Sequence, residues 1–339
     1  IDPGQRSTSG ADFRSSLTGL PFALTCGTTP ASRHHGAHMR LPGLIDVHVH
    51  AREPGAVHKE DWDSCTAAAL AGGFVQVLGM PNTRPPVTDA ASLDLALAAC
   101  ARRARCDYGH FVGATEDNAQ IAAELAARSC GLKLYLCHTF GPLLMDQRAG
   151  WRAHFQRWPT WRPIAVHAEA DTLAAVLTLA QECDRHVHVC HLPTFGDLKL
   201  VMAARDRGAR VTCEVTPHHL LLDTDDINRL GAGRAEVRPR LAPPADRRAL
   251  WRHLDEIDCF ATDHAPHTAA EKDGPNPPPG FPTLEQALAL MLTAVHAGLL
   301  DLSQLVARMA HNPRRIFAIA EPAQTWIEVD VDAQWTIPE

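Results

Sequence analysis

Residues 44–50 read Leu-Ile-Asp-Val-His-Val-His, a short apolar run that ends in two histidines. Such a run is typical of a buried strand, and its period of two puts His48 and His50 on the same face. Two imidazoles on one face can chelate a metal ion, although two hydrogen-bonded core histidines would give the same pattern. Other parts of the sequence are needed to distinguish a metal site from two core histidines.

Seven further apolar runs follow, and Ala- and Leu-rich amphipathic segments lie between them. This alternation is typical of βα units and a parallel sheet. The eight runs are 44–50, 73–81, 108–115, 131–136, 163–169, 186–192, 210–217 and 259–267. The helical candidates are 60–71, 90–104, 118–128, 171–182, 195–207, 284–297 and 302–310. The pattern predicts an α/β fold, a closed (β/α)8 TIM-like barrel over residues 40–320.

The two ends of the chain differ from this pattern. Residues 1–39 are rich in Ser, Thr, Gly and Pro and have no strand or helix period, so we expect an irregular tail. The tail ends in Gly36-Ala37-His38-Met39, a string that cloning can leave behind, and it is therefore set aside as not necessarily native. Residues 321–339 alternate like a strand from Trp326 to Val331 and predict a C-terminal β-like segment.

The composition is that of a globular protein and argues against nucleic-acid-binding and membrane-spanning proteins. A length of 339 residues with 45% hydrophobic and 21% charged residues suits one globular barrel. The net charge of −7 offers no basic stripe, so no nucleic-acid partner is expected. No apolar stretch approaches the ~18 residues that span a membrane. Ten cysteines without a C-x-x-C pair predict reduced thiols and a cytoplasmic protein.

Polar residues lie within the apolar runs or directly after them, and most of them are near the carboxyl ends. In a barrel of this type these ends carry the catalytic residues, so we expect the polar side chains to converge at one mouth. Besides the two histidines of the first run, they are Asn82, Lys133, His167, His191, Glu214, Asp263 and His267.

Lys133 lies within the apolar run Gly-Leu-Lys-Leu-Tyr-Leu, where a lysine is unexpected because burying an ammonium costs free energy. One interpretation is a lysine that reaches along its stem to solvent at the barrel mouth. In the other, the deprotonated amine adds carbon dioxide to form a carbamate, whose two oxygens can each hold a cation. Imidazoles and carboxylates of the same mouth would complete sites for two zinc ions. This chemistry indicates hydrolysis, or its reversal, at an amide-like carbon.

Taken together, the motifs resemble those of dihydroorotases in the amidohydrolase superfamily. They are Leu41–His50, Arg52–Gly55, Met80–Thr83, Gly131–Leu134, His167–Glu169, Cys190-His191 and Asp263–His267. The likeness covers residues 40–339 and is closest to the dihydroorotase domain of the animal multifunctional protein. That protein also carries carbamoyl-phosphate synthetase and aspartate transcarbamylase.

The resemblance implies a ligand set. His48, His50, carboxylated Lys133 and Asp263 would hold one zinc ion, and Lys133, His167 and His191 would hold a second. A third zinc is implied at His48, Cys190 and Glu214. A buried, inert thiol at Cys190 remains the alternative, because adjacent strand residues point to opposite faces unless the strand twists or ends.

The resemblance also implies roles towards a small-molecule substrate. Arg52, Asn82 and His267 would hold its carboxylate, with charge-assisted hydrogen bonds from Arg52. Thr139 and Phe140 match a loop that closes over the substrate and excludes water. Asp263 would be the catalytic proton shuttle, which takes the proton of the attacking water and passes it to the leaving nitrogen.

The implied activity is the zinc-dependent, reversible cyclisation of N-carbamoyl-L-aspartate to L-dihydroorotate in pyrimidine biosynthesis. A hydantoinase or dihydropyrimidinase is the first alternative, and an inactive dihydroorotase-like scaffold domain is the second. A homo-oligomer and a fusion to the other two enzymes both remain open. The family also has a small β side domain, which we expect to be incomplete here because the leading segment is irregular and the chain stops at Glu339.

Overall fold

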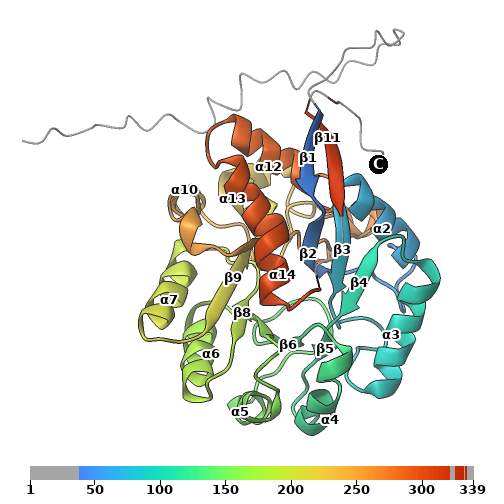
Figure 1. Ribbon diagram of the computed structural model, residues 1–339, viewed down its shortest axis with the longest axis vertical. Coiled ribbons are helices and arrows are strands. Elements are labelled where there is room, and N and C mark those ends of the chain that lie inside the picture. The colour runs from blue at the N-terminus through green and yellow to red at the C-terminus, as the bar shows by residue number, and fades with distance from the viewer. Residues whose placement is uncertain (1–37, 321–324, 332, 334–339) are drawn as a thin grey trace, which may run out of the picture.

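The computed structural model describes residues 38–320, 325–331 and 333 (Figure 1). Most of the predicted tail and residues 334–339 therefore lie outside the described residues. His38 and Met39, which the sequence placed in the tail, instead begin a strand, because their backbone pairs with the C-terminal segment. No helix in the described ranges is long and apolar enough to cross a membrane.

Parallel strands form the centre of the molecule. They are β2 (Leu44–Val49), β3 (Phe74–Gly79), β4 (Asp107–His110), β5 (Val112–Gly113), β6 (Leu132–Tyr135), β7 (Ile164–His167), β8 (Val187–Val189), β9 (Val211–Val215) and β10 (Cys259–Phe260). All eight predicted runs contain strand residues. The third run holds two strands, since β4 pairs with β3 and β5 pairs with β6 on either side of Phe111. The hydrogen-bonded order β10-β9-β8-β7-β6-β5 continues through this junction into β4, β3 and β2.

The sheet closes between its first and last strands. The amide of His50 donates to the carbonyl of His264 at 2.8 Å, and Val49 forms a parallel bridge with His264. The buried carboxylate of Asp46 accepts from the amide of Thr262 at 3.2 Å. A side chain thus replaces part of the backbone ladder at this seam, and the α/β barrel prediction is confirmed.

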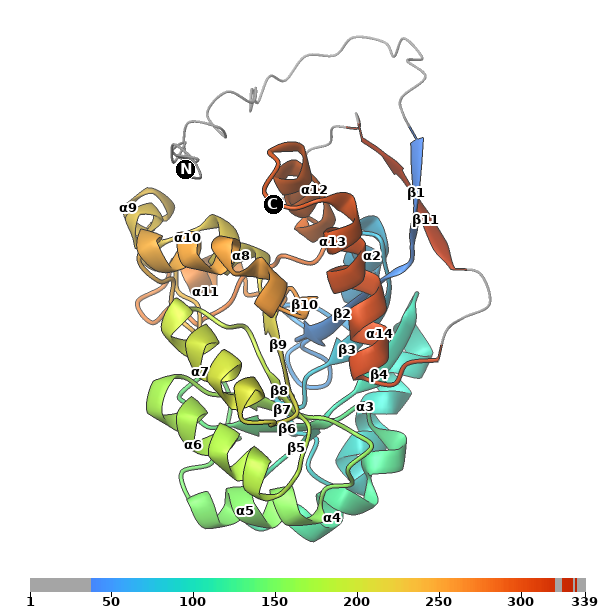
Figure 2. The same cartoon turned by 60° about the vertical axis from the view of Figure 1, so that its left-hand side comes forward.

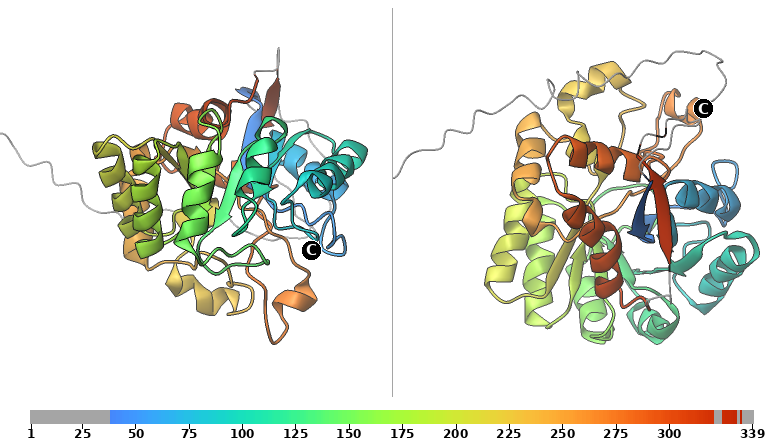
Figure 3. Two further views of the ribbon diagram at one scale, coloured as in Figure 1. Left: turned by 90° about the horizontal axis from the view of Figure 1, so that it is seen from below. Right: turned by 45° about the horizontal axis from the view of Figure 1, so that its top comes forward.

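Helices surround the strands (Figures 1 and 3). The helices that follow barrel strands are α2 (Trp62–Ala71), α3 (Ala90–Arg103), α4 (Ala119–Glu124), α5 (Arg148–Arg157), α6 (Ala170–Glu182) and α7 (Phe195–Asp206). The later helices are α8 (Pro217–Leu221), α9 (Ile227–Leu230), α10 (Pro244–Arg252), α11 (Ala269–Lys272), α12 (Ala287–His296), α13 (Leu302–Val306) and α14 (Asn312–Ile316). Their apolar faces pack on the strands and bury the main core.

Some helices differ from the sequence prediction. The predicted helix 302–310 is α13 followed by a π-helical turn, Ala307–His311, before α14 begins. Within that turn the Arg308 guanidinium donates to the carbonyls of Ile257 and Leu254 at 2.9 and 2.7 Å. Helices α5 and α10 were not among the predicted segments, because polar residues dominate both sequences.

A two-stranded antiparallel sheet lies beside the barrel (Figure 2). It pairs β1 (His38–Pro42) with β11 (Trp326–Asp330), in the register His38 opposite Asp330. The expected C-terminal strand is therefore present, and its partner is the segment just before β2. This pair is the part of the expected side domain that lies within the described residues.

Candidate metal centre

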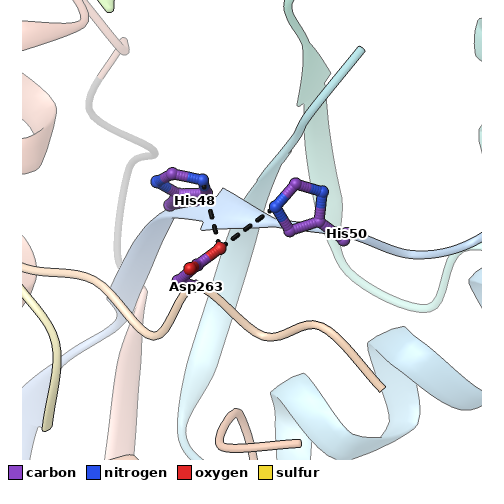
Figure 4. A group of neighbouring side chains, drawn as sticks. All are labelled: His48, His50 and Asp263. Carbon is purple, nitrogen blue, oxygen red and sulfur yellow. Dashed lines mark hydrogen bonds and ion pairs between the residues drawn. The ribbon is translucent and has the colours of Figure 1, made fainter. Parts of the chain in front are cut away.

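Two histidines and one carboxylate form the first part of the centre (Figure 4). His48 lies on β2, His50 follows that strand, and Asp263 lies beyond β10 on the other side of the seam. Asp263 Oδ1 is 3.2 Å from His48 Nε2 and 3.0 Å from His50 Nε2. Closure of the barrel therefore brings Asp263 to His48 and His50, although it lies more than 200 residues from them in sequence.

Glu214 of β9 extends the cluster on the other side of His48. Its Oε1 is 2.5 Å from His48 Nδ1, and its Oε2 is 3.0 Å from His188 Nε2. Ligand atoms of His48, Cys190 and Glu214 all lie within 4.8 Å of one another. These three residues are the set implied for a third metal ion, and they are buried together.

Lys133 on β6 lies in the same interior and is 0% exposed. Its Nζ donates to Cys190 Sγ at 2.8 Å and lies 5.2 Å from the centre of the Tyr135 ring. The interpretation of a lysine that reaches solvent is therefore wrong. A buried ammonium against a thiol is an expensive arrangement, which carboxylation of the amine beside bound cations would avoid.

His167 and His191 are the last two candidate ligands of the cluster. His167 Nδ1 is 2.8 Å from His191 Nε2, while the buried His167 Nε2 and His191 Nδ1 have no hydrogen-bond partner among the described residues. Burial and the charge of Lys133 lower the pKa of His167 to about 3. Neutral imidazoles with unsatisfied nitrogens are suited to metal coordination, and a cation would supply the missing partners.

Three residues of the cluster have left-handed backbones. The φ angles are 61° for Arg52, 38° for His191 and 47° for Asp263. A non-glycine residue in this region costs about 1–2 kcal/mol, and such residues concentrate at functional sites. The turn at His191 follows the end of β8 at Val189, so Cys190 and His191 can both face the centre although they are adjacent.

The charged side chains of the centre shift one another's pKa values. Burial alone would raise the pKa of Asp263, but His48, His50 and His191 hold it well below 3.8. Burial and Lys133 lower the pKa of His48, yet Asp263 and Glu214 together raise it to about 10. Without a metal ion, a proton on His48 separates two carboxylates. A divalent cation can replace that proton, so metal uptake should release protons.

The buried imidazoles predict how stability depends on pH. Burial lowers the pKa of His50 to about 4 and that of His167 to about 3. Because unfolded histidine titrates near 6.5, the unfolded chain binds more protons between about pH 6.5 and 3. The free energy of unfolding of the metal-free chain should therefore fall as pH drops through this window, by up to ~1.4 kcal/mol per pKa unit and histidine.

Urea unfolding at pH 7, 6 and 5 measures this dependence. His48 has the opposite sign, since its raised pKa gives stability that is lost as pH rises towards 10. His167→Asn should make the acid-side slope shallower. An unchanged slope would show that His167 is not a neutral, buried imidazole in the folded chain.

The residues implied for substrate binding lie next to the metal cluster. Asn82 Oδ1 is 2.7 Å from His50 Nδ1, and Asn82 Nδ2 donates to the Phe140 carbonyl at 2.9 Å. The Phe140 ring lies 5.4 Å from the His267 ring and 5.5 Å from the Arg52 guanidinium carbon. The loop that carries Thr139 and Phe140 therefore lies over the centre.

Two cavities meet at this loop. The inner cavity encloses about 20 Å³, and its lining includes Thr139, Phe140 and the metal-ligand candidates His50, His167 and Asp263. The outer cavity of about 470 Å³ shares Phe140 and His50 with it. The Phe140 side chain therefore lies between the metal-ligand candidates and the larger outer cavity, the position expected of a residue that controls access to the centre.

Several residues of the site were missed by the sequence analysis. Tyr135 and Arg238 line the inner cavity, and the buried Tyr135 hydroxyl has no partner within the part of the chain that the structure describes. His188 binds Glu214, as described above. Only Tyr135 had a usable signal, since it lies two residues after Lys133 on the same strand and so faces the same side.

Glu60, Cys65 and His264 form another close group of possible ligands. His264 Nδ1 accepts from the Leu284 amide at 3.3 Å, which leaves the proton on Nε2. That nitrogen lies 2.9 Å from Glu60 Oε1 and can donate to it. Both ring nitrogens of His264 therefore have hydrogen-bond partners, and we interpret this group as structural.

The barrel and its polar mouth define a class of protein, the amidohydrolase barrels. Residues 37–139 match the family model described as dihydro-orotase-like. The chain is 53% identical over 302 residues to multifunctional protein pyr1-3 of Dictyostelium discoideum, covering 89% of this chain and 14% of that protein. It is 34% identical to the dihydroorotase of Methanothermobacter thermautotrophicus, covering 88% of this chain and 74% of that enzyme.

Solved structures give the same result for the fold. An L-hydantoinase from Arthrobacter aurescens aligns with a TM-score of 0.78 at 23% identity, covering 83% of this chain and 72% of that one. The inactive dihydroorotase-like domain of a Chaetomium thermophilum multifunctional protein aligns with a TM-score of 0.75 at 29% identity, covering 89% and 86%. The chain therefore belongs to the dihydroorotase family.

Proposed function

We propose that the chain is a zinc-dependent dihydroorotase, which interconverts N-carbamoyl-L-aspartate and L-dihydroorotate. The observation that carries the proposal is the convergence of four imidazoles, Lys133 and Asp263 beside Arg52, Asn82 and His267. A carboxylated Lys133 would hold two zinc ions with His48, His50, His167, His191 and Asp263. When bound, zinc would activate the attacking water and polarise the carbonyl.

The chain's own residues supply the remaining chemistry. In ring opening, the ionised Asp263 accepts the proton of the attacking water and delivers it to the leaving ring nitrogen. Ring closure is the reverse, so it starts with Asp263 protonated. Arg52 and Asn82 would hold the substrate carboxylate, and Phe140 would exclude bulk water above it. Cys190 and Glu214 would hold a third zinc with His48.

A hydantoinase and an inactive scaffold domain are the two alternatives to a dihydroorotase, and each would differ from it in its site residues. Hydantoinases act on rings without a carboxylate, whereas the buried Arg52 beside Asn82 favours a carboxylate-bearing ring. An inactive scaffold domain would be expected to lack metal ligands, and each implied ligand is present in this chain. The similarity to a protein named multifunctional supports fusion to further enzymes, and buried free thiols such as Cys65 support a reducing, cytoplasmic setting.

Zinc content and turnover of the purified chain test the proposal. We expect two to three zinc ions per chain by elemental analysis, the upper value if the third site fills, with turnover of carbamoyl-aspartate and dihydroorotate but not hydantoin. Two zinc ions without turnover of either substrate would favour the scaffold. Faster turnover of hydantoin or dihydrouracil would favour the first alternative.

Arg52→Ala should raise KM and leave the zinc content unchanged. The Arg52 side chain donates to the Pro266 carbonyl at 3.0 Å and faces Phe140, and Arg52 is not one of the implied metal ligands. Loss of a charged hydrogen bond corresponds to at least about a tenfold rise in KM. Arg52→Lys is the matched control, which keeps the charge but not the bidentate fork. Loss of zinc in the alanine variant would make Arg52 a structural residue instead.

A further inference from the structure

Lys59 connects three parts of the site although it belongs to none of the roles assigned above. Its side chain is 6% exposed, and its Nζ lies 2.9 Å from Glu271 Oε1. The same Nζ lies 2.9 Å from His267 Nδ1 and 5.1 Å from the centre of the Phe140 ring. Lys59 therefore joins the loop after β2 to the segment after β10, beneath the loop that covers the centre.

The contact with Lys59 determines which nitrogen of His267 carries the proton. An ammonium paired with a carboxylate has three donors and no acceptor, so His267 Nδ1 must accept. Burial, with the nearby charges of Arg52 and Lys59, lowers the pKa of His267 to about 3, which keeps the ring neutral. The single ring proton therefore lies on Nε2, and Nε2 donates to the Pro279 carbonyl at 3.0 Å.

This tautomer creates an unsatisfied contact with Arg52. Arg52 Nη2 lies 3.0 Å from His267 Nε2, and a guanidinium cannot accept a hydrogen bond. Two donors therefore face each other, and the Pro279 carbonyl accepts from one of them, His267 Nε2. A carboxylate oxygen placed between them would accept from both, which turns an unfavourable contact into two charge-assisted or polar hydrogen bonds.

We propose that Lys59 is a positioning residue that fixes His267 as an Nε2–H donor and thereby prepares the Arg52–His267 pair for a carboxylate. The inference rests on the proposed function only in taking this carboxylate to be that of the substrate. Without the ammonium, the proton can move to Nδ1. His267 Nε2 then gives up its hydrogen bond to the Pro279 carbonyl and accepts from Arg52 Nη2, so the Arg52–His267 pair satisfies itself instead of binding an anion.

Three variants test this role. Lys59→Met removes the donor at similar length, Lys59→Arg keeps a donor, and Glu271→Gln keeps Lys59 while removing its ion pair. Glutamine also preserves the cap of α11, where the Thr268 amide donates to Glu271 Oε2 at 3.0 Å. Lys59→Met should raise KM for carbamoyl-aspartate by at least about tenfold, with kcat changed less than about threefold. Lys59→Arg and Glu271→Gln should stay within about threefold of the wild-type KM.

The tautomer is measured directly by NMR on chain with ¹⁵N-labelled histidine, with the His267 signals assigned by comparison with His267→Gln. We expect the Nε2–H form in the wild type and in Glu271→Gln, and the Nδ1–H form in Lys59→Met. An unchanged tautomer in Lys59→Met overturns the proposal, as does an unchanged KM. A chain that turns over neither substrate refutes the proposed function, while the NMR result still decides the role of Lys59.

Discussion

Asp263→Asn should retain most of the bound metal and lose activity by at least about 100-fold, the usual contribution of a general acid–base group. Asparagine keeps an oxygen near His48 Nε2 and His50 Nε2, which lie 3.2 and 3.0 Å from Asp263 Oδ1. It cannot accept the proton that ring opening releases. Elemental analysis and rates in both directions would measure the two effects separately.

Asp263→Ala is the control for this prediction, and it should lose metal as well as activity. The pH dependence of the wild type gives a second check. Since the pKa of Asp263 is held well below 3.8, the protonated form that ring closure needs is scarce near neutral pH, and it becomes more abundant as pH falls. Ring closure should therefore gain relative to ring opening. Near-normal turnover by a fully metal-loaded Asp263→Asn chain would assign the proton transfer to another residue.

Lys133→Met should abolish activity and metal binding while it stabilises the metal-free chain. Methionine fills the same buried volume without an ammonium, and replacing a buried charge by an apolar group can add about 1–4 kcal/mol. It cannot form a carbamate, so the proposed bridge between the ions is lost. A fall in turnover of at least about a thousandfold is expected, since the activated water depends on both ions.

The opposite signs of the two effects make the Lys133 experiment specific. A merely misfolded variant would lose activity and stability together. Lys199→Met is the matched control, because Lys199 is exposed on α7 and should change neither quantity. Urea unfolding of metal-free chains and zinc analysis supply the measurements. A Lys133→Met chain that still binds two zinc ions and turns over substrate would contradict the carbamate bridge.

The barrel could be predicted from sequence because buried parallel strands and amphipathic helices leave distinct local periods. The exact strand limits could not. The run 259–267 reads as one long strand, yet β10 ends at Phe260. Beyond it, the carboxylate of Asp46 takes the Thr262 amide and the backbone turns at Asp263. Such contacts join residues far apart in the chain and leave no local pattern.

The candidate ligands were identifiable from their chemistry, because imidazoles, a carboxylate and a lysine are unusual at the ends of apolar strands. The residues that orient these ligands and the substrate-binding side chains could not be identified from the sequence. Lys59 looks like an ordinary surface lysine in a polar loop, and only the fold brings it to His267 and Glu271. Likewise, the left-handed turn at His191, which lets Cys190 face the centre, depends on where β8 ends.

The left-handed turns limit how the protein can be engineered for heat resistance. Of the six non-glycine residues with positive φ in the described chain, three are Arg52, His191 and Asp263. Glycine at any of them would relieve backbone strain but remove a guanidinium, an imidazole or a carboxylate from the centre. A mutant library selected on melting temperature alone would therefore enrich inactive clones at these codons. Directed evolution of this barrel should keep all three fixed and search the helical exterior instead.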